Sequence, residues 1–136
     1  MKSENGKASG KGKGKDQMKR ESCKVTFRTD EDRLIALISG EVDHHNARKI
    51  RAEIDAKMMS TRPAELTLDL SLVSFMDSSG LGLILGRFSK ASDLGIPFSV
   101  SNPTGPTQKI LDLAGMDRIV RITRDKVRDK REEKAV

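Results

Sequence analysis

The sequence predicts an α/β fold in which helices alternate with the strands of a mixed, mostly parallel sheet of about five strands. Segments with strand-like apolar patterns are separated by longer segments whose apolar residues recur at helical spacing. The first two strand patterns are joined by a short polar turn, so this pair is expected to be antiparallel, whereas the later strands need right-handed crossovers and run parallel. The expected order is β-β-α-β-α-β-α-β, followed by a weak C-terminal helix.

The strand segments are recognised by their apolar patterns. Cys23, Val25 and Phe27 alternate with polar residues, which predicts a strand with one face in water. Residues 34–38 form a continuous apolar run closed by Gly40, which is typical of a buried central strand. Further strands are expected at residues 65–70, 96–100 and 119–122.

Three segments combine helical spacing of apolar residues with start and stop signals. In the first, the apolar positions are Ala47, Ile50, Ile54 and Met58. The start signals of the three helices are Asn46, Ser78 and Thr104, and the stop signals are Pro63, Gly95 and Gly115.

The length of 136 residues indicates one domain, and most of the positive charge lies at its two ends. Residues 1–22 are rich in Gly, Ser and Lys with a net charge of +4, so we expect a disordered basic tail. Residues 23–123 are expected to form the domain, and residues 124–136 a charged helix or tail of marginal stability. Because residues 23–116 carry a net charge of −1, the folded part is not expected to bind DNA directly.

The composition excludes several classes of protein and leaves one alternative. No apolar run reaches the ~18 residues of a membrane span, and the basic N-terminus lacks the apolar core of a signal peptide. The single cysteine, Cys23, favours a reducing compartment, so we expect a cytoplasmic protein. Without Trp or Tyr, the chain lacks platforms for stacking bases. The alternative is a scaffold whose basic tails bind nucleic acid or membrane while the core only oligomerises.

The most unusual segment is SFMDSSGLG at residues 74–82, in a loop expected just past the third strand. Open α/β sheets bind ligands and partners at the carboxyl ends of their strands. We expect Ser78 or Ser79 to be the N-cap of the following helix, with Asp77 adding negative charge at the positive end of the helix dipole.

Glycines in the first turn of this helix suggest a contact surface. Gly80 and Gly82 carry no side chains there, so another molecule could approach the backbone closely. An ordinary capped helix after a strand explains the same residues and remains an alternative.

Catalytic and metal-binding hypotheses fit these residues poorly. A serine hydrolase could combine a serine with His44 or His45 and Asp43, but the glycine two positions before the nucleophile is missing. A metal site at residues 43–45 lacks further ligands at a useful spacing. We therefore expect no catalytic residue, no metal and no cofactor, and a loop position for one of the histidines.

A phosphoacceptor serine fits the segment better. A serine at an exposed helix start is accessible to a kinase, and the helix N-terminus tolerates the negative charge of a phosphate. The helix should therefore persist after phosphorylation, and the effect should fall on a partner that contacts this edge.

Two motifs resemble the anti-sigma factor antagonists, which are single STAS domains. These motifs are GEVDHHNA at residues 40–47 and SFMDSSGLGLILG at residues 74–86. The resemblance covers residues 23–123 in element order as well as in motif. The segment Asp43-His44-His45 and the paired serines are similar in particular to those of the sporulation type, the antagonist of the anti-sigma F factor. The general-stress type usually carries a different loop there.

The resemblance implies a partner switch in which the protein is not an enzyme. The unmodified form would bind an anti-sigma factor that is also an ATP-dependent serine kinase, and so release the sigma factor. The kinase would phosphorylate Ser78, and the modified form would dissociate until a serine phosphatase restores it. This would regulate transcription in sporulation or, alternatively, in a stress-signalling pathway.

The expected contact surface surrounds the phosphoacceptor. Asp77, Ser79 and Gly80 would form its rim. Asp43 and His44 would join them if the second loop lies at the same edge of the sheet.

Overall fold

The computed structural model describes residues 23–124, which form five strands, three α-helices and one short 3₁₀ helix. In chain order the elements are β1 Cys23–Asp30, β2 Arg33–Val42, α3 His44–Thr61, β3 Glu65–Met76, α4 Ser78–Asp93, β4 Phe98–Ser101, α5 Gly105–Leu113, η1 Met116–Arg118 and β5 Arg121–Thr123. The predicted tail at residues 1–22 and the predicted helix after Arg124 lie outside the described residues. No described helix is both long enough and apolar enough to cross a bilayer.

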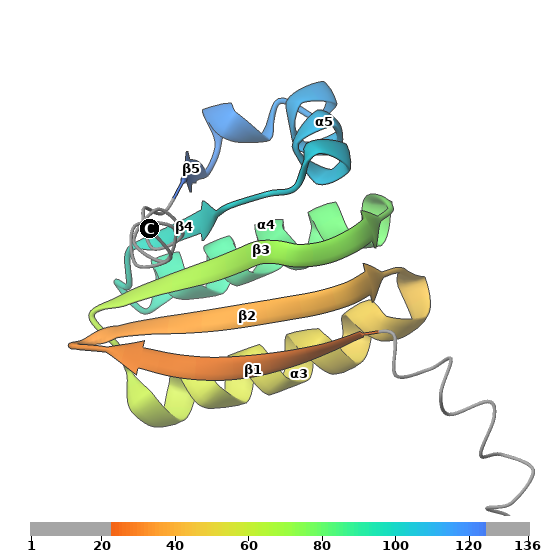
Figure 1. Cartoon of the computed structure of the whole chain (residues 1–136). Coiled ribbons are helices and arrows are strands. Elements are labelled where there is room, and N and C mark those ends of the chain that lie inside the picture. Colours follow the sequence, from red (N-terminus) through yellow and green to blue (C-terminus); the bar gives the residue numbers. More distant parts are fainter. Residues whose placement is uncertain (1–22, 125–136) are drawn as a thin grey trace, which may run out of the picture.

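The strands form one mixed sheet in the order β1-β2-β3-β4-β5 (Figure 1). β1 and β2 form an antiparallel hairpin, and each later pair of neighbours is parallel. A helix connects each parallel pair, and α3 and α4 lie behind the sheet in the view of Figure 1. The third helix, α5, contacts β3 and η1. The predicted fold class and element order are therefore confirmed.

The hydrophobic core fills the space between the sheet and the helices α3 and α4. Its fully buried side chains are Leu34, Ile38, Leu66, Leu68 and Leu70 from the sheet and Ile50, Ile54, Met58 and Ile84 from the helices. The three residues of α3 recur at intervals of four, so they form one apolar stripe that faces the sheet. The predicted apolar positions of the first helix are confirmed, except that Ala47 is only partly buried.

The strand boundaries predicted from the sequence are partly wrong. β2 continues to Val42 and β3 to Met76, so residues 74–76 lie in a strand and not in the predicted loop. β4 begins at Phe98, two residues late, because the Pro97 nitrogen carries no hydrogen for a sheet hydrogen bond. Residues 119 and 120 follow η1, and β5 starts only at Arg121.

Two β-bulges explain why the end of β3 was missed. Leu37 pairs with Asp69 and Ser39 with Leu72, so β3 has one residue more than β2 in this interval. A second extra residue follows before Glu41 pairs with Phe75. Each bulge shifts the alternation of side chains by one position, so a period-2 pattern read from the sequence stops at residue 70.

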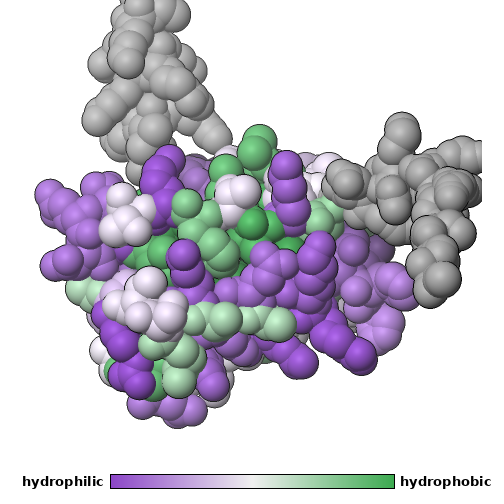
Figure 2. Space-filling view, turned by 90° about the horizontal axis from the view of Figure 1, so that it is seen from below, coloured by the Kyte–Doolittle hydropathy of each residue, from purple (hydrophilic) through white to green (hydrophobic). Residues whose placement is uncertain are grey.

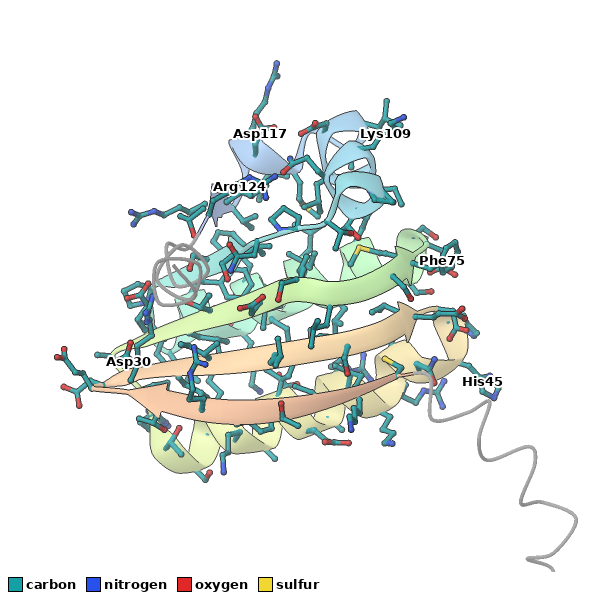
Figure 3. The ribbon with its side chains drawn as sticks, viewed as in Figure 1. Asp30, His45, Phe75, Lys109, Asp117 and Arg124 are labelled. Atoms are coloured by element: carbon teal, nitrogen blue, oxygen red, sulfur yellow. The ribbon has the colours of Figure 1, made fainter. Side chains whose placement is uncertain are left out.

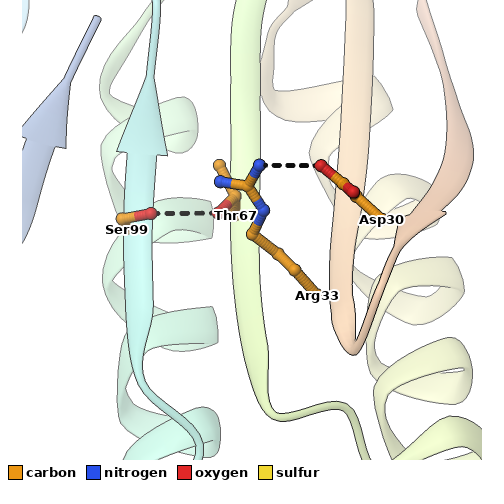
Figure 4. A network of polar contacts seen from close by, with 4 residues as sticks. All are labelled: Asp30, Arg33, Thr67 and Ser99. Carbon is orange, nitrogen blue, oxygen red and sulfur yellow. Dashed lines mark hydrogen bonds and ion pairs between the residues drawn. The ribbon is translucent and has the colours of Figure 1, made fainter. Parts of the chain in front are cut away.

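The face of the sheet opposite α3 and α4 is mainly polar. Thr67 and Ser99 are neighbours on β3 and β4, and their hydroxyl oxygens share a hydrogen bond of 3.0 Å (Figure 4). Both residues are buried, so this hydrogen bond satisfies two hydroxyls that would otherwise be costly to remove from water. At the hairpin, Arg33 Nη2 lies 3.2 Å from Asp30 Oδ2 in an exposed ion pair.

The edge strand β1 has both apolar and charged side chains. Seen from the side of β1 and α3, apolar residues gather between hydrophilic ones (Figure 2). Phe27 is partly buried there, with the Lys57 Nζ 5.5 Å from its ring centroid. Exposed Lys24 and Arg28 alternate with the inward residues of β1, which makes pairing with a further strand unfavourable.

Candidate functional site

The two segments singled out in the sequence meet at one edge of the sheet. β2 and β3 are adjacent and parallel, so their carboxyl ends lie together, and α3 and α4 begin directly after them. The Asp77 backbone N–H donates to the Val42 carbonyl oxygen at 3.3 Å and joins the two junctions. The expectation that Asp43 and His44 share an edge with Asp77 and Ser78 therefore agrees with this placement.

Aspartates, and not the predicted residues, cap both helices. Asp77 Oδ1 accepts from the Ser79 N–H at 2.8 Å, so neither Ser78 nor Ser79 is the N-cap of α4. Asp43 Oδ1 accepts from the Asn46 N–H at 2.9 Å, so Asn46 lies inside α3 and is not its N-cap. Both aspartates have extended backbones and a carboxylate that reaches the first free N–H groups of the helix.

This capping leaves the Ser78 hydroxyl available. Ser78 is the first residue of α4 and its side chain is exposed. Within residues 23–124 no group forms a hydrogen bond with its hydroxyl. Ser79 is only partly exposed and its backbone N–H is engaged with Asp77. Ser78 is thus the more accessible of the paired serines.

The structure assigns different environments to the two glycines. Gly80 is buried, and a Cβ at this position would lie 2.8 Å from Met76 Sδ and closer still to Met76 Cγ. Gly82 is exposed, and a Cβ there would have no neighbour within 4 Å. The close approach that was expected from another molecule at Gly80 is instead an internal contact with Met76. Gly82 is the glycine that leaves the surface open.

The adjacent histidines lie in the first turn of α3 and not in a loop. Both are exposed, and Figure 3 shows His45 directed away from the fold. The loop prediction for one of them was wrong because Asp43 caps the helix three residues earlier than expected. In the part of the chain that the structure describes, no group of three or more His, Cys, Asp or Glu is arranged to hold a metal ion.

Sequence reasoning missed an ion pair between the two helices that begin at this edge. Arg87 of α4 is 5% exposed, and its Nε lies 2.8 Å from Asp55 Oδ1 of α3. Burial lowers the pKa of Arg87 from its usual value, and the negative charge of Asp55 opposes this shift. The sequence did contain a signal for this ion pair, because Arg87 is a charged residue at a core-facing position of the helical pattern and so needs a buried partner.

Comparisons with known proteins agree with this fold. The model of the STAS domain family matches residues 24–133. A curated relative, the anti-sigma F factor antagonist of Paenibacillus polymyxa, is 36% identical over 89 residues, which are 65% of this chain and 76% of the relative. The chain therefore belongs to the STAS domain family and, within it, to the anti-sigma factor antagonists.

Solved structures have the same fold. The anti-sigma factor antagonist SpoIIAA in its unphosphorylated form has a TM-score of 0.64 at 24% identity, covering 84% of this chain and 98% of its own. The Bacillus cell fate determinant SpoIIAA in the phosphorylated form has a TM-score of 0.59 at 24% identity, covering 80% and 97%. At this identity the two structures support the fold alone.

Proposed function

We propose that this anti-sigma factor antagonist is switched by phosphorylation of Ser78. The observation that carries the proposal is the exposed Ser78 hydroxyl, which forms no hydrogen bond within residues 23–124 because Asp77 caps α4 in its place. The existence of a phosphorylated form of the fold neighbour SpoIIAA supports it. The unphosphorylated protein binds a cytoplasmic anti-sigma factor with serine kinase activity, and the sigma factor is released.

The chemistry at Ser78 is a phosphoryl transfer catalysed by the partner. The Ser78 oxygen forms a bond to the γ-phosphorus of ATP, the bond from that phosphorus to the ADP oxygen breaks, and the hydroxyl proton goes to a base of the kinase. A serine phosphatase reverses the modification by hydrolysis, which returns Ser78 and inorganic phosphate. The antagonist holds the Ser78 hydroxyl where the kinase can reach it, and it is not itself a catalyst.

The partner surface is proposed to surround Ser78 at the carboxyl edge of the sheet. Asp77, Ser79, Asp43 and His44 are close enough along the two helix starts to belong to one contact rim. A phosphate adds about −1.5 to −2 charges at its centre. If the partner surface is complementary to the unmodified rim, this charge should weaken binding by roughly a hundredfold or more. The buried Gly80 acts in this rim only by shaping the first turn.

The residues at the start of α3 suggest which pathway the protein regulates. Asp43-His44-His45 is similar to the sporulation type, so we propose that the controlled sigma factor acts in sporulation. A general-stress role is the alternative. Reconstitution with candidate anti-sigma factor kinases distinguishes them by which complex releases its sigma factor.

The test is phosphate mapping followed by binding measurements. With ATP and the kinase, the wild-type protein should gain one phosphate, located on Ser78 by mass spectrometry. Ser78→Ala should gain none and stay bound to the kinase, while Ser78→Asp should bind poorly and remain folded.

Two variants serve as controls for this test. Ser79→Ala should still be phosphorylated. Ser89→Asp adds the same charge at an exposed position farther along α4 and should bind normally. Phosphate found only on another residue, or equal binding by Ser78→Asp and the wild type, would refute the proposed switch.

A further inference from the structure

Two large apolar side chains are exposed near the Ser78 edge. Leu72 is 55% exposed and Phe75 is 48% exposed, although both belong to β3. The other phenylalanines are packed: the rings of Phe88 and Phe98 have centroids 5.9 Å apart, and Phe27 contacts the core. Apolar side chains on a sheet are usually turned inward, so this pair requires a structural reason.

The β-bulges of β3 are the structural reason. A regular strand would turn Leu72 toward the core, because Leu70 faces the core two residues earlier. The first bulge turns Leu72 outward beside Ser39, and Val73 takes the core position. The second bulge does the same for Phe75, which lies beside the exposed Glu41. The local structure thus places two apolar side chains on the face opposite α3 and α4.

This pair is continuous with the proposed contact rim. Phe75 precedes Ser78 by three residues, and its neighbour Glu41 precedes Asp43 by two. Figure 3 shows Phe75 and His45 at the same edge of the sheet. A partner that reaches the Ser78 hydroxyl therefore lies within reach of Phe75.

We propose that Leu72 and Phe75 form an apolar anchor for an apolar patch on the anti-sigma factor kinase. This inference rests on the proposed function and identifies the residues that supply affinity. Interfaces commonly combine an apolar centre with a polar rim, and aromatic residues are enriched among the side chains that dominate binding. Two side chains supply only part of the roughly 800 Å² that a stable interface usually buries on each partner. The kinase is favoured over a second copy of this chain because, to phosphorylate Ser78, it must also contact the rim beside Phe75, which adds to the buried area.

The anchor and Ser78 have separate roles in this arrangement. Apolar contacts do not depend on charge, so the anchor stabilises the complex whether or not Ser78 is phosphorylated. The phosphate acts at the rim, where it disturbs polar complementarity. Affinity and switching should therefore be separable by mutation.

The first experiment measures affinity for the kinase in the presence of ADP. The double variant Leu72→Ser, Phe75→Ala should bind at least about tenfold more weakly than the wild type. Phe75→Leu alone should retain most of the affinity, because it preserves an apolar side chain. Leu113→Ser is the matched control, since Leu113 is 83% exposed at the C-terminal end of α5 and should leave binding unchanged. Thermal denaturation should confirm that every variant is folded.

The second experiment combines the anchor variant with Ser78→Asp. The two losses in affinity should add in a double-mutant cycle, and the anchor variant should raise the KM for phosphorylation while kcat stays unchanged. Wild-type affinity in the anchor variant, or a change confined to its own oligomeric state in sedimentation, would overturn the anchor while leaving the switch intact. If the wild-type protein itself neither binds the kinase nor accepts a phosphate, the proposed function fails, and the anchor with it.

Discussion

At the scale of single residues, the environment of each side chain near Ser78 is decided by a neighbour. The Asp77 carboxylate occupies the capping position, and the exposed Ser78 hydroxyl has no hydrogen-bond partner among the described residues. Met76 lies against Gly80, so a residue with a side chain cannot be added there without moving the core. Of the paired serines, Ser78 is thus the more exposed, and of the two glycines only Gly80 is packed against a core side chain.

Substituting the two glycines should have opposite effects on stability. Gly80→Ala should lower the free energy of unfolding by roughly 1–2 kcal/mol, because its Cβ would lie 2.8 Å from the sulfur of the buried Met76. Gly82→Ala should raise it by up to about 1 kcal/mol, since alanine favours a helix and no atom lies within 4 Å of its Cβ. Urea unfolding of both variants measures this, and equal effects would contradict the assigned packing role.

The thiol of Cys23 should be unreactive in the folded protein. Burial, together with the negative charge of Asp43, raises the pKa of Cys23 from 9.0 to about 11. The thiolate is the reactive form, so alkylation by iodoacetamide at pH 8 should be slow until denaturant is added.

The same shift should affect stability at high pH. Below about pH 9 the thiol is protonated in both states and has no effect. Between about pH 9 and 11 only the unfolded state ionises, so stability should fall as the pH rises. Cys23→Ala should remove this part of the pH dependence of the free energy of unfolding. An unchanged pH dependence would show that Cys23 does not contribute.

At the scale of elements, α3 and α4 determine where the candidate site lies. Both helices begin at the same edge, and each begins with an aspartate cap. They pack against each other, and the ion pair between Asp55 and Arg87 joins them away from their N-termini. The pair therefore fixes one helix relative to the other along the side that faces the core.

Replacing Asp55 should lower the free energy of unfolding more than replacing Arg87 does. The Arg87 side chain is 6% exposed and that of Asp55 is 27% exposed. Asp55→Ala leaves a buried cation without its partner and should lower the free energy of unfolding by about 3 kcal/mol or more. Arg87→Met should cost less, because it replaces the charge by an apolar side chain and the remaining carboxylate can reach water. Chemical denaturation of both variants tests this order, and a larger loss in Arg87→Met would contradict it.

At the scale of the whole molecule, the candidate site lies along one edge of the sheet. It combines the ends of two adjacent parallel strands with the starts of two helices, so residues from positions 41–46 and 72–80 form one surface. The remainder of the sheet has a covered apolar face, and its opposite face carries polar contacts such as the hydrogen bond between Thr67 and Ser99 (Figure 4). A surface of this kind suits a docking partner, and the switch proposed at Ser78 would require no rearrangement of the fold.

Phosphorylation should therefore leave the fold intact. A phosphate on Ser78 lies at the N-terminus of α4, where negative charge is stabilised by about 0.3–1 kcal/mol. The phosphorylated protein should have an equal or slightly higher melting temperature and an unchanged far-ultraviolet circular dichroism spectrum. A clear loss of stability on phosphorylation would indicate a conformational switch and contradict an interface mechanism.

Local patterns determined the order of the elements and the segment that carries the site. Alternating and helical spacings of apolar residues predicted five strands and three helices, because burial of one face imposes the period of the element. The motif at residues 74–82 singled out the paired serines and Asp77 as candidates without any knowledge of tertiary contacts, and the resemblance to the anti-sigma factor antagonists selected Ser78. These features depend on residues that are close together in the chain.

Only the tertiary structure decided the features that depend on pairing between distant segments. The bulges of β3 follow from its register with β2, so the exposure of Leu72 and Phe75 could not be read from alternation. The burial of Gly80 depends on the direction of the Met76 side chain, and the partner of Arg87 comes from another helix. Sequence periodicity records which face of an element is buried, whereas register and side-chain packing are set when separate elements meet.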